Sequence, residues 1–304
     1  MVILKLSMPE TQNQKFNHLK IHTQYSICEG AIKIEDLKNF CKEKKIQTVG
    51  LSDTSNLCGA LEFAENISKI GTQPIIGTQI NFKFEDTIGL LPLIALNEDG
   101  YKRIIELSSM SYLDNNALSE PHCNIEELYK DNKGVLILSG SILGFFGKLF
   151  DKGRFSEISE IYQKILSNFK DRFYLEIQRH GDQGEKNFEI YLLNTSKKLE
   201  IPLIASQEVF YLDKDMHEAH DAFLCVGEKT YINVKERRRY TNEHYLKSSE
   251  EMFKVFKDLP EAIDNNVNFP LRISYRPKNS SPVLPNIQTD KVKNVDELLL
   301  KESI

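Results

Sequence analysis

Residues 16–30 read FNHLKIHTQYSICEG, and the strand-like stretch HLKIHT at residues 18–23 decides how the rest of the chain is interpreted. Alternation along a strand predicts His18, Lys20 and His22 on one face, with Leu19 and Ile21 on the other. Two histidines two residues apart on a strand point the same way and can chelate a metal. Here the first of those two positions is Lys20, and its ammonium group has no lone pair to offer a cation.

Outward from this stretch, short apolar strands alternate with amphipathic helices. Seven strands are expected, at residues 18–23, 47–52, 73–82, 90–96, 134–139, 173–178 and 202–206. Such alternation predicts a parallel sheet, which is either closed into a barrel or open and doubly wound. Polar residues follow most of these strands, namely His22, Asp53, Gln79, His180 and Glu208. Because a barrel gathers all its carboxyl-terminal strand ends at one rim, the sequence favours a seven-stranded parallel β/α barrel.

Composition narrows the functional class. The chain has 304 residues, of which 40% are hydrophobic and 27% charged, and its formal net charge is −5. A negative charge argues against a dedicated nucleic-acid binder. The five cysteines form no CxxC pair, so neither a zinc ribbon nor a disulfide framework is indicated, and reduced cysteines in a cytoplasm fit best. No apolar run is long enough to predict a membrane span.

The rim residues suggest a metal site by their type. His22, Asp53, His180 and Glu208 form a set that could hold zinc or manganese. The alternative is that they are ordinary rim residues, because polar side chains crowd the rim of any barrel.

Four other histidines are weaker candidates. His217 and His220 lie at helical i,i+3 spacing, where packing or capping is the expected role. His122 and His244 are expected in loops. No GxGxxG, Walker, GxSxG or HExxH motif occurs in the chain.

The pattern changes near residue 228, where the sequence becomes polar and irregular. A basic run makes Arg237, Arg238 and Arg239 candidate contacts to nucleic acid, which would be the property of a DNA-binding module. A run of this size is more often a solvated face. Residues 276–290 have the composition of a linker, and the last residues predict the start of a helix.

Several stretches together, in this order, resemble one family. They include HLKIHTQYSICEG, GLSDTSNLCGALEF, QPIIGTQINF, LIALNEDGYKRIIELSS, FYLEIQRHG and IPLIASQEVFYLDKDMHEAHDAFLCVG. The chain resembles the PHP (polymerase and histidinol phosphatase) family, in the form that opens the alpha subunit of bacterial DNA polymerase III. The resemblance covers nearly the whole chain. It implies a distorted seven-stranded β/α barrel, and active members of the family hold up to three rim metal ions and hydrolyse phosphoesters.

The resemblance also implies which rim positions hold ligands in the family. His22, Asp53 and His180 match those ligands. The departures are Lys20, Thr54 and Leu90 for histidines, Gln79 for a glutamate, and Glu208 and Phe210 for an aspartate–histidine pair. Three matching ligands are too few to assemble a multinuclear metal site. No metal cofactor is therefore expected. Binding of a single weakly held metal ion by His22, Asp53 and His180 remains an alternative. His18 is the last of the remnant rim positions.

These departures predict a degenerate, non-catalytic PHP domain that serves as a structural and protein-binding module. The implied partners are the rest of the alpha subunit, the epsilon proofreading exonuclease and, through the full-length protein, DNA. The implied boundaries are residues 1–275 for the PHP domain, with a rim extension at about 228–275, and residues 276–304 for a linker and the start of the polymerase core. The family's polymerase active site lies beyond residue 304. The alternative is a metal-dependent phosphoesterase or 3′–5′ exonuclease that uses zinc or manganese through an unusual ligand set.

One electrostatic prediction follows from the loss of metal ligands. Without a metal ion, Asp53 and Glu208 would be crowded carboxylates without a counter-ion. We therefore predict that the Lys20 ammonium pairs with at least one of them and replaces the metal by a fixed organic cation.

Overall fold

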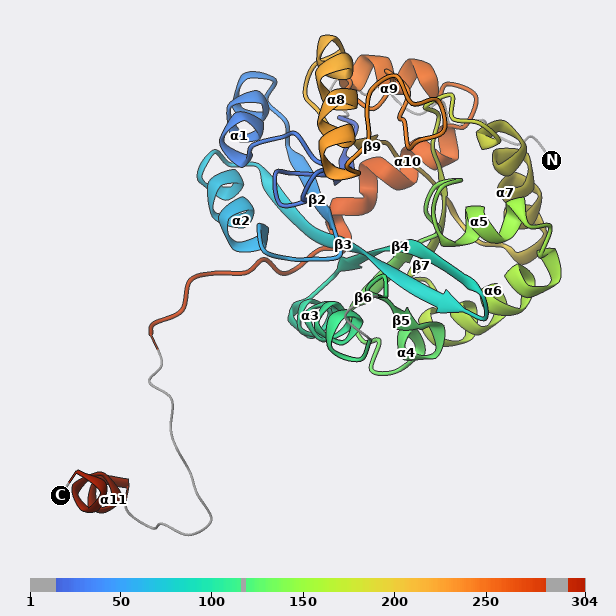
Figure 1. Ribbon diagram of the computed structural model, residues 1–304. Helices are drawn as coiled ribbons and strands as arrows, with labels where there is room; N and C mark the ends of the chain where they lie inside the picture. Colours follow the sequence, from blue (N-terminus) through green and yellow to red (C-terminus); the bar gives the residue numbers. More distant parts are fainter. Residues whose placement is uncertain (1–14, 116–118, 283–294, 304) are drawn as a thin grey trace, which may run out of the picture.

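The computed structural model describes residues 15–115, 119–282 and 295–303, and its centre is one curled sheet (Figure 1). The strands are β1 (His18–Ile21), β2 (Thr48–Thr54), β3 (Gln73–Phe84), β4 (Thr87–Ala95), β5 (Cys123–Asn124), β6 (Val135–Leu138), β7 (Phe173–Ile177), β8 (Leu203–Ala205) and β9 (Glu208–Val209). Their order across the sheet is β8-β7-β6-β4-β3-β2-β1-β9, and β5 pairs with β3. All seven predicted strands are present, while the short strands β5 and β9 were not predicted.

Helices cover the sheet, with α1 and α2 on one side and α5, α6 and α7 on the opposite side (Figure 1). The helices are α1 (Ile34–Glu43), α2 (Ala60–Lys69), α3 (Glu98–Leu113), α4 (Ile125–Tyr129), α5 (Phe145–Asp151), α6 (Phe155–Phe169), α7 (Glu185–Leu199), α8 (His217–Gly227), α9 (Ser249–Val255), α10 (Pro260–Asn268) and α11 (Val295–Glu302), with 3-10 turns η1 (Lys214–Met216) and η2 (Phe269–Arg272). Amphipathic spacing explains this packing, since α1 buries Ile34, Leu37 and Cys41. Among the described residues, no helix is both long and apolar enough to cross a membrane.

The direction of β4 corrects the predicted architecture. β4 runs antiparallel to both of its neighbours, β3 and β6. The turn between β3 and β4 consists of Glu85 and Asp86 alone, and a two-residue turn makes a hairpin because a parallel crossover needs a much longer connection. The prediction of an all-parallel seven-stranded barrel is therefore wrong at this strand, and the sheet is mixed.

The two ends of the strand order are close together in the sequence. β8 pairs with β7, whereas β9 pairs with β1 and places Glu208 opposite Lys20. Only Ser206 and Gln207 lie between β8 and β9. One short stretch of chain therefore links the last strand of the order to the first, and the sheet takes a barrel-like form. This curl brings side chains from β1, β7 and β9 together.

β1 is irregular, which alters the predicted alternation. In the pairing of β1 with β2, His18 is opposite Val49 and Ile21 is opposite Leu51. Between these two pairs β1 therefore has one residue more than β2, which is a bulge. Leu19 packs in an apolar cluster that includes residues of β3, β6, β7 and β8, whereas Ile21 packs against α1 and α2. The prediction that Leu19 and Ile21 share a face is wrong, because the bulge turns part of the strand over.

Gly50 makes room for this bulge. A Cβ atom at Gly50 would lie 2.5 Å from the carbonyl oxygen of Leu19. We expect Gly50→Ala to lower the free energy of unfolding by about 1–3 kcal/mol, because backbone has to move to relieve the overlap. Urea denaturation measures this. Ser109→Ala, on the exposed side of α3, is the control with a change within about 0.5 kcal/mol, and equal stability of Gly50→Ala and wild type would contradict the steric argument.

Candidate functional site

Lys20 is the cation at the centre of the site. Its side chain is fully buried, and its Nζ atom lies 3.5 Å from Glu176 Oε1 and 3.3 Å from Glu208 Oε2. Burial lowers the pKa of Lys20, but the charges of Glu176 and Glu208 outweigh it, and the pKa is raised above its ordinary value. The predicted pairing with Asp53 or Glu208 is confirmed for Glu208. Glu176, in the middle of β7, is a partner that the sequence did not indicate.

The negative charge of Glu208 is balanced by neighbouring protein groups. The Nε2 atom of His22 donates to Glu208 Oε1 at 2.9 Å, and the side-chain amide of Gln79 donates to the same oxygen. Burial raises the pKa of Glu208, but Lys20, His22 and Gln79 together hold it well below its usual range. Glu208 is therefore ionised at neutral pH, and its charge is matched without a metal ion.

Asp53, at the end of β2, is satisfied by the turn that follows β1. Its Oδ1 atom accepts from the backbone N–H of Thr23 at 2.6 Å and from Ser26 Oγ at 2.8 Å. Its Oδ2 atom accepts from Thr23 Oγ1 at 2.8 Å. Burial raises the pKa of Asp53 in spite of these hydrogen bonds. Among the described residues Lys20 pairs with Glu208 and not with Asp53, and the prediction required only one of the two.

Glu29 is a second carboxylate of the site that sequence reasoning missed. Thr54, at a position where the resemblance implies a histidine, donates its hydroxyl to Glu29. Arg238 and the hydroxyl of Tyr240 donate to Glu29 Oε1 at 2.9 and 3.0 Å. Glu29 therefore connects the turn after β1 to residues 228–248. The sequence feature that could have pointed to Glu29 is its place, as a carboxylate, in the turn that follows His22.

Phe210 closes the site with an aromatic stack. Its ring lies 4.4 Å from the ring of His22 on one side and 4.3 Å from the ring of Tyr240 on the other, centroid to centroid. Phe210 is buried, and it stands where the resemblance implies a histidine ligand. Leu90, another such position, lies inside β4 and is level with Asn81 of β3. Both positions therefore carry carbon where a metal site needs nitrogen.

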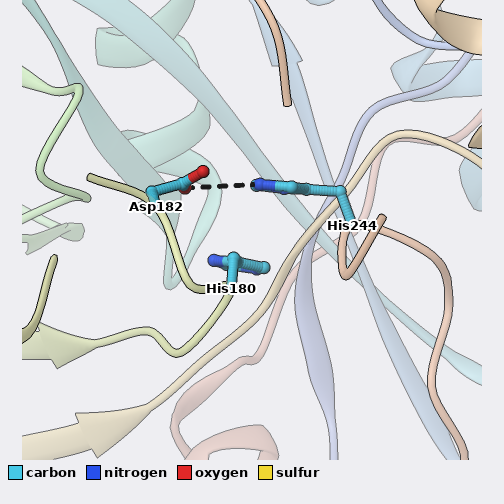
Figure 2. A group of neighbouring side chains, drawn as sticks. All are labelled: His180, Asp182 and His244. Carbon is cyan, nitrogen blue, oxygen red and sulfur yellow. Dashed lines mark ion pairs between the residues drawn. The ribbon is translucent and has the colours of Figure 1, made fainter. Parts of the chain in front are cut away.

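His180 and His244 form a second group beside Glu208, together with Asp182 (Figure 2). The rings of His180 and His244 are parallel within 4°, with centroids 4.0 Å apart. The backbone N–H of Glu208 donates to His180 Nε2 at 3.2 Å, and His244 Nδ1 donates to the Glu208 carbonyl oxygen at 3.1 Å. Burial, followed by the neighbouring His244, holds the pKa of His180 well below its usual range. His180 is therefore a neutral ring that orients the backbone of β9.

This group has the composition of a metal site without the right arrangement. His244 Nε2 and Asp182 Oδ2 are 3.4 Å apart, a spacing that two ligands of one ion could have. An imidazole lone pair lies in the plane of its ring, so two stacked parallel rings cannot both direct lone pairs at one ion. His180 Nε2 already accepts a hydrogen bond, which leaves the ring proton on Nδ1. The three side chains do not fit a shared metal ion as they stand.

The rim residues do not fit the multinuclear metal centre implied by the family either. The ammonium of Lys20 occupies the space between two carboxylates and would repel a metal ion. His22 has both ring nitrogens in contacts, Nε2 with Glu208 and Nδ1 with Ser26 at 3.1 Å. Asp53 has both oxygens in hydrogen bonds. A metal ion would have to break these contacts before it could bind.

His18 does not join the remnant site. Its Nε2 atom bonds the carbonyl oxygen of Lys247 at 2.9 Å, and its ring packs edge-on against Phe16. The prediction that His18 shares a face with Lys20 and His22 is wrong, because the bulge in β1 separates them. The ring is buried away from the carboxylates that hold Lys20.

The buried His18 ring predicts a pH effect on stability. Burial lowers the pKa of His18 to about 4, below the ordinary value of 6.5. Below pH 6.5 the unfolded chain binds this proton more readily than the folded chain does, so the free energy of unfolding falls as pH falls toward 4. Between pH 7 and 5 this group accounts for a loss of about 2 kcal/mol. His18→Gln is expected to remove that part of the loss in urea titrations at the two pH values. His122→Gln, at a half-buried loop position, is the control, and an unchanged pH dependence in His18→Gln would contradict the assignment.

The arginine run is engaged with the protein itself. Arg237 pairs with Asp221 at 2.5 Å through a nearly buried side chain. Arg238 pairs with Glu29 and Glu228, each at 2.9 Å, and Arg239 donates to the Ile232 carbonyl oxygen at 3.0 Å. The DNA contacts predicted for Arg237, Arg238 and Arg239 remain a prediction, and two of the three arginines already hold carboxylates.

The other histidines follow the sequence-based expectation in part. The Nε2 atoms of His217 and His220 contact the carbonyl oxygens of Tyr240 at 3.0 Å and Glu29 at 2.7 Å, which agrees with packing roles on α8. His122 lies in a loop and is half-buried. His244 also lies in a loop but is buried against His180. This contact was missed because a loop residue far along the chain gives no periodic signal.

Comparison with known proteins places the chain in a family. The model of the PHP domain matches residues 18–180, which is more than half of the chain. The DNA polymerase III alpha subunit of Caulobacter vibrioides is 36% identical over 96% of this chain and 26% of its own length. That of Rickettsia bellii is 33% identical over 95% of this chain and 25% of its own length.

A solved structure described as a putative metal-dependent phosphoesterase from Bifidobacterium adolescentis matches with a TM-score of 0.43 and 14% identity. This match covers 63% of this chain and 86% of that chain. The chain spans about a quarter of the length of the curated relatives it matches. With a family model over more than half of its residues, the chain belongs to the PHP domain family, and it is similar to the PHP region of bacterial DNA polymerase III alpha subunits.

Proposed function

We propose that this chain is the amino-terminal PHP domain of a replicative DNA polymerase III alpha subunit and that it no longer hydrolyses phosphoesters. The observation that carries the proposal is the buried Lys20 ammonium between Glu176 and Glu208. In an active family member the rim carboxylates are neutralised by metal ions. Here one side chain performs that electrostatic task, and the domain keeps its fold without the chemistry that a metal ion supplies.

The surroundings of Lys20 support the loss of hydrolysis. Metal-assisted hydrolysis needs an ion with an open position at which water is activated. His22 is committed to Glu208, and Phe210 packs against the His22 ring. Among the described rim residues, Gln79 donates to Glu208 and both oxygens of Asp53 accept hydrogen bonds, so these groups are also engaged within the protein. We therefore assign no catalytic residue to this chain.

The proposed role is structural. Residues 1–275 would form the PHP domain as a distorted barrel, and residues 276–304 would be a linker and the first part of the polymerase core. The side chain of Asn266 on α10 supports an integral role for residues up to 275, because it bonds Asn17 before β1 and Ala205 of β8 at 2.8 and 2.9 Å. Residues 283–294, in the predicted linker, lie outside the described residues. Contact with DNA would be made by the full-length protein, in the cytoplasm.

The epsilon proofreading exonuclease is the proposed partner outside the chain. Binding is tested with this 304-residue chain and its own epsilon subunit by titration calorimetry, in buffer with and without EDTA. The proposal expects binding at micromolar concentration or tighter, with the same affinity in both buffers. Absence of binding at micromolar concentration would contradict the role, and binding lost in EDTA would indicate a metal that the proposal excludes.

The second candidate is a metal-dependent phosphoesterase or 3′–5′ exonuclease, and the group of His180, Asp182 and His244 is the observation that favours it. The assay is release of nucleotides from end-labelled DNA with added Zn²⁺ or Mn²⁺. The proposed silent domain predicts no release above buffer. Release that is lost in His244→Gln and kept in His217→Gln would establish the second candidate instead.

A further inference from the structure

A groove of about 820 Å³ lies between α3 and the turns that follow β1 and β2, away from Lys20. Its walls are mainly apolar and aromatic, from Tyr25, Ile27, Leu57, Tyr101, Ile105 and Tyr112, with Cys58 at the edge. Among the described residues, every side chain that lines the groove is uncharged. A groove of this composition is suited to an apolar segment and offers no charge to select an acidic or basic one.

The groove leaves large apolar side chains in water. Ile27 is 82% exposed, Tyr112 is 53% exposed and Ile105 is 40% exposed. Leu113, next to Tyr112 at the end of α3, is 81% exposed. Single exposed apolar residues are ordinary, but a group of them around one hollow is typical of an interaction site.

The groove is built before any segment enters it. The hydroxyl of Tyr25 donates to Glu62 at 2.6 Å, which fixes that wall to α2. Asn56 donates to the carbonyl oxygen of Tyr25 at 2.8 Å, and Ser108 of α3 donates to the Ser55 carbonyl oxygen at 3.2 Å. Because these contacts order the walls, little conformational entropy is lost when a segment binds.

The chain leaves the domain beside this groove. Ser274 donates its backbone N–H to the Leu96 carbonyl oxygen at 2.8 Å, and the Tyr275 ring packs 5.4 Å from the ring of Tyr101, which lines the groove. Further on, Asn279 donates to Glu65 of α2. The departing residues thus pass α3, which lines the groove, and α2, to which Tyr25 of the groove wall is bonded.

We infer that this groove docks an apolar segment of the polypeptide that continues beyond residue 304 in alpha subunits of the kind this chain resembles. The inference rests on the proposed function, since about three quarters of those relatives' length lies outside this match. The tether past Tyr275 keeps the following polypeptide near the groove at an effective concentration on the order of millimolar, so an apolar surface without charge selectivity suffices.

Cys58 provides a direct probe of the groove. It is exposed and lines the groove, whereas Cys41, Cys123 and Cys225 are buried and Cys28 is half-buried. In a Cys28→Ser background, the rate of maleimide labelling at Cys58 is measured in the 304-residue chain and in the full-length alpha subunit. Docking predicts at least about tenfold slower labelling in the full-length protein, because a docked segment excludes the reagent.

Two variants make the comparison specific. Ile105→Asp places a carboxylate in the groove and is expected to restore fast labelling in the full-length protein without changing it in the 304-residue chain. A cysteine introduced by Ser167→Cys, on the exposed side of α6, is the control and should label equally in both proteins.

Other outcomes overturn the inference. Equal labelling rates of Cys58 in the two proteins would contradict docking of a segment in the groove. Protection that appears only after the epsilon subunit is added assigns the groove to that subunit, and protection that grows with the concentration of the 304-residue chain assigns it to a second copy. These labelling experiments do not depend on Lys20. Failure of the docking inference is therefore distinguishable from failure of the proposed function.

Discussion

Replacing Lys20 with methionine is expected to lower the free energy of unfolding by about 3–5 kcal/mol, the range for one partner removed from a buried ion pair. The variant leaves Glu176 and Glu208 buried without the ammonium that lies 3.5 and 3.3 Å from them. Methionine fills nearly the same volume, so the loss reports charge and not a cavity. Urea denaturation at pH 7 measures it.

The pH dependence gives the Lys20 result a second signature. In the wild type, Lys20 and His22 hold the pKa of Glu208 well below its usual range, so Glu208 stabilises the fold above its ordinary value of 4.5 and this contribution is lost as pH falls further. Without Lys20, Glu208 can take up a proton more readily, so the gap in stability between variant and wild type should narrow as pH falls.

Lys164→Met is the matched control for Lys20→Met. Lys164 pairs with Glu126 and Glu160 on the surface, and its loss is expected to cost less than about 1 kcal/mol. If Lys20→Met were as stable as this control, Lys20 would not be the cation that the site depends on.

Replacing Phe210 with alanine is the second large effect, with an expected loss of about 3–5 kcal/mol, because a fully buried ring is removed and a cavity is left. The ring separates His22 from Tyr240, at centroid distances of 4.4 and 4.3 Å. Its loss also removes one of the contacts that join residues 228–248 to the turn after β1. Thermal and urea denaturation measure the change.

Tyr231→Ala is the control for Phe210→Ala, since Tyr231 is largely exposed and its loss should change stability by no more than about 0.5 kcal/mol. A loss below about 1 kcal/mol in Phe210→Ala would mean that the site relaxes around the missing ring. Phe210 would then not be the residue that closes the site.

The sequence predicted the parts of the fold that depend on local periodicity. Short apolar runs became the strands, and the expected amphipathic helices formed, as in α1, which buries Ile34, Leu37 and Cys41. Charge balance predicted that Lys20 would pair with Asp53 or Glu208, and it pairs with Glu208. These inferences need only the spacing of residues and the cost of an unpaired buried charge.

The remaining features depend on contacts between distant parts of the chain. The direction of β4 follows from a two-residue turn at Glu85 that apolar periodicity does not register. The bulge in β1 separates His18 from Lys20, and strict alternation cannot foresee an extra residue. Glu176 and His244 reach the site from a strand interior and from a loop, and neither position carries a sequence signal.

The central claim is that the Lys20 ammonium has taken the place of a metal ion at this rim. Elemental analysis of the chain, purified without chelators in zinc- and manganese-supplemented medium, tests it most directly. The account predicts zinc and manganese contents far below one ion per chain, and an unchanged unfolding midpoint after treatment with EDTA. A content close to one ion per chain, with a midpoint that falls when the ion is removed, would contradict it.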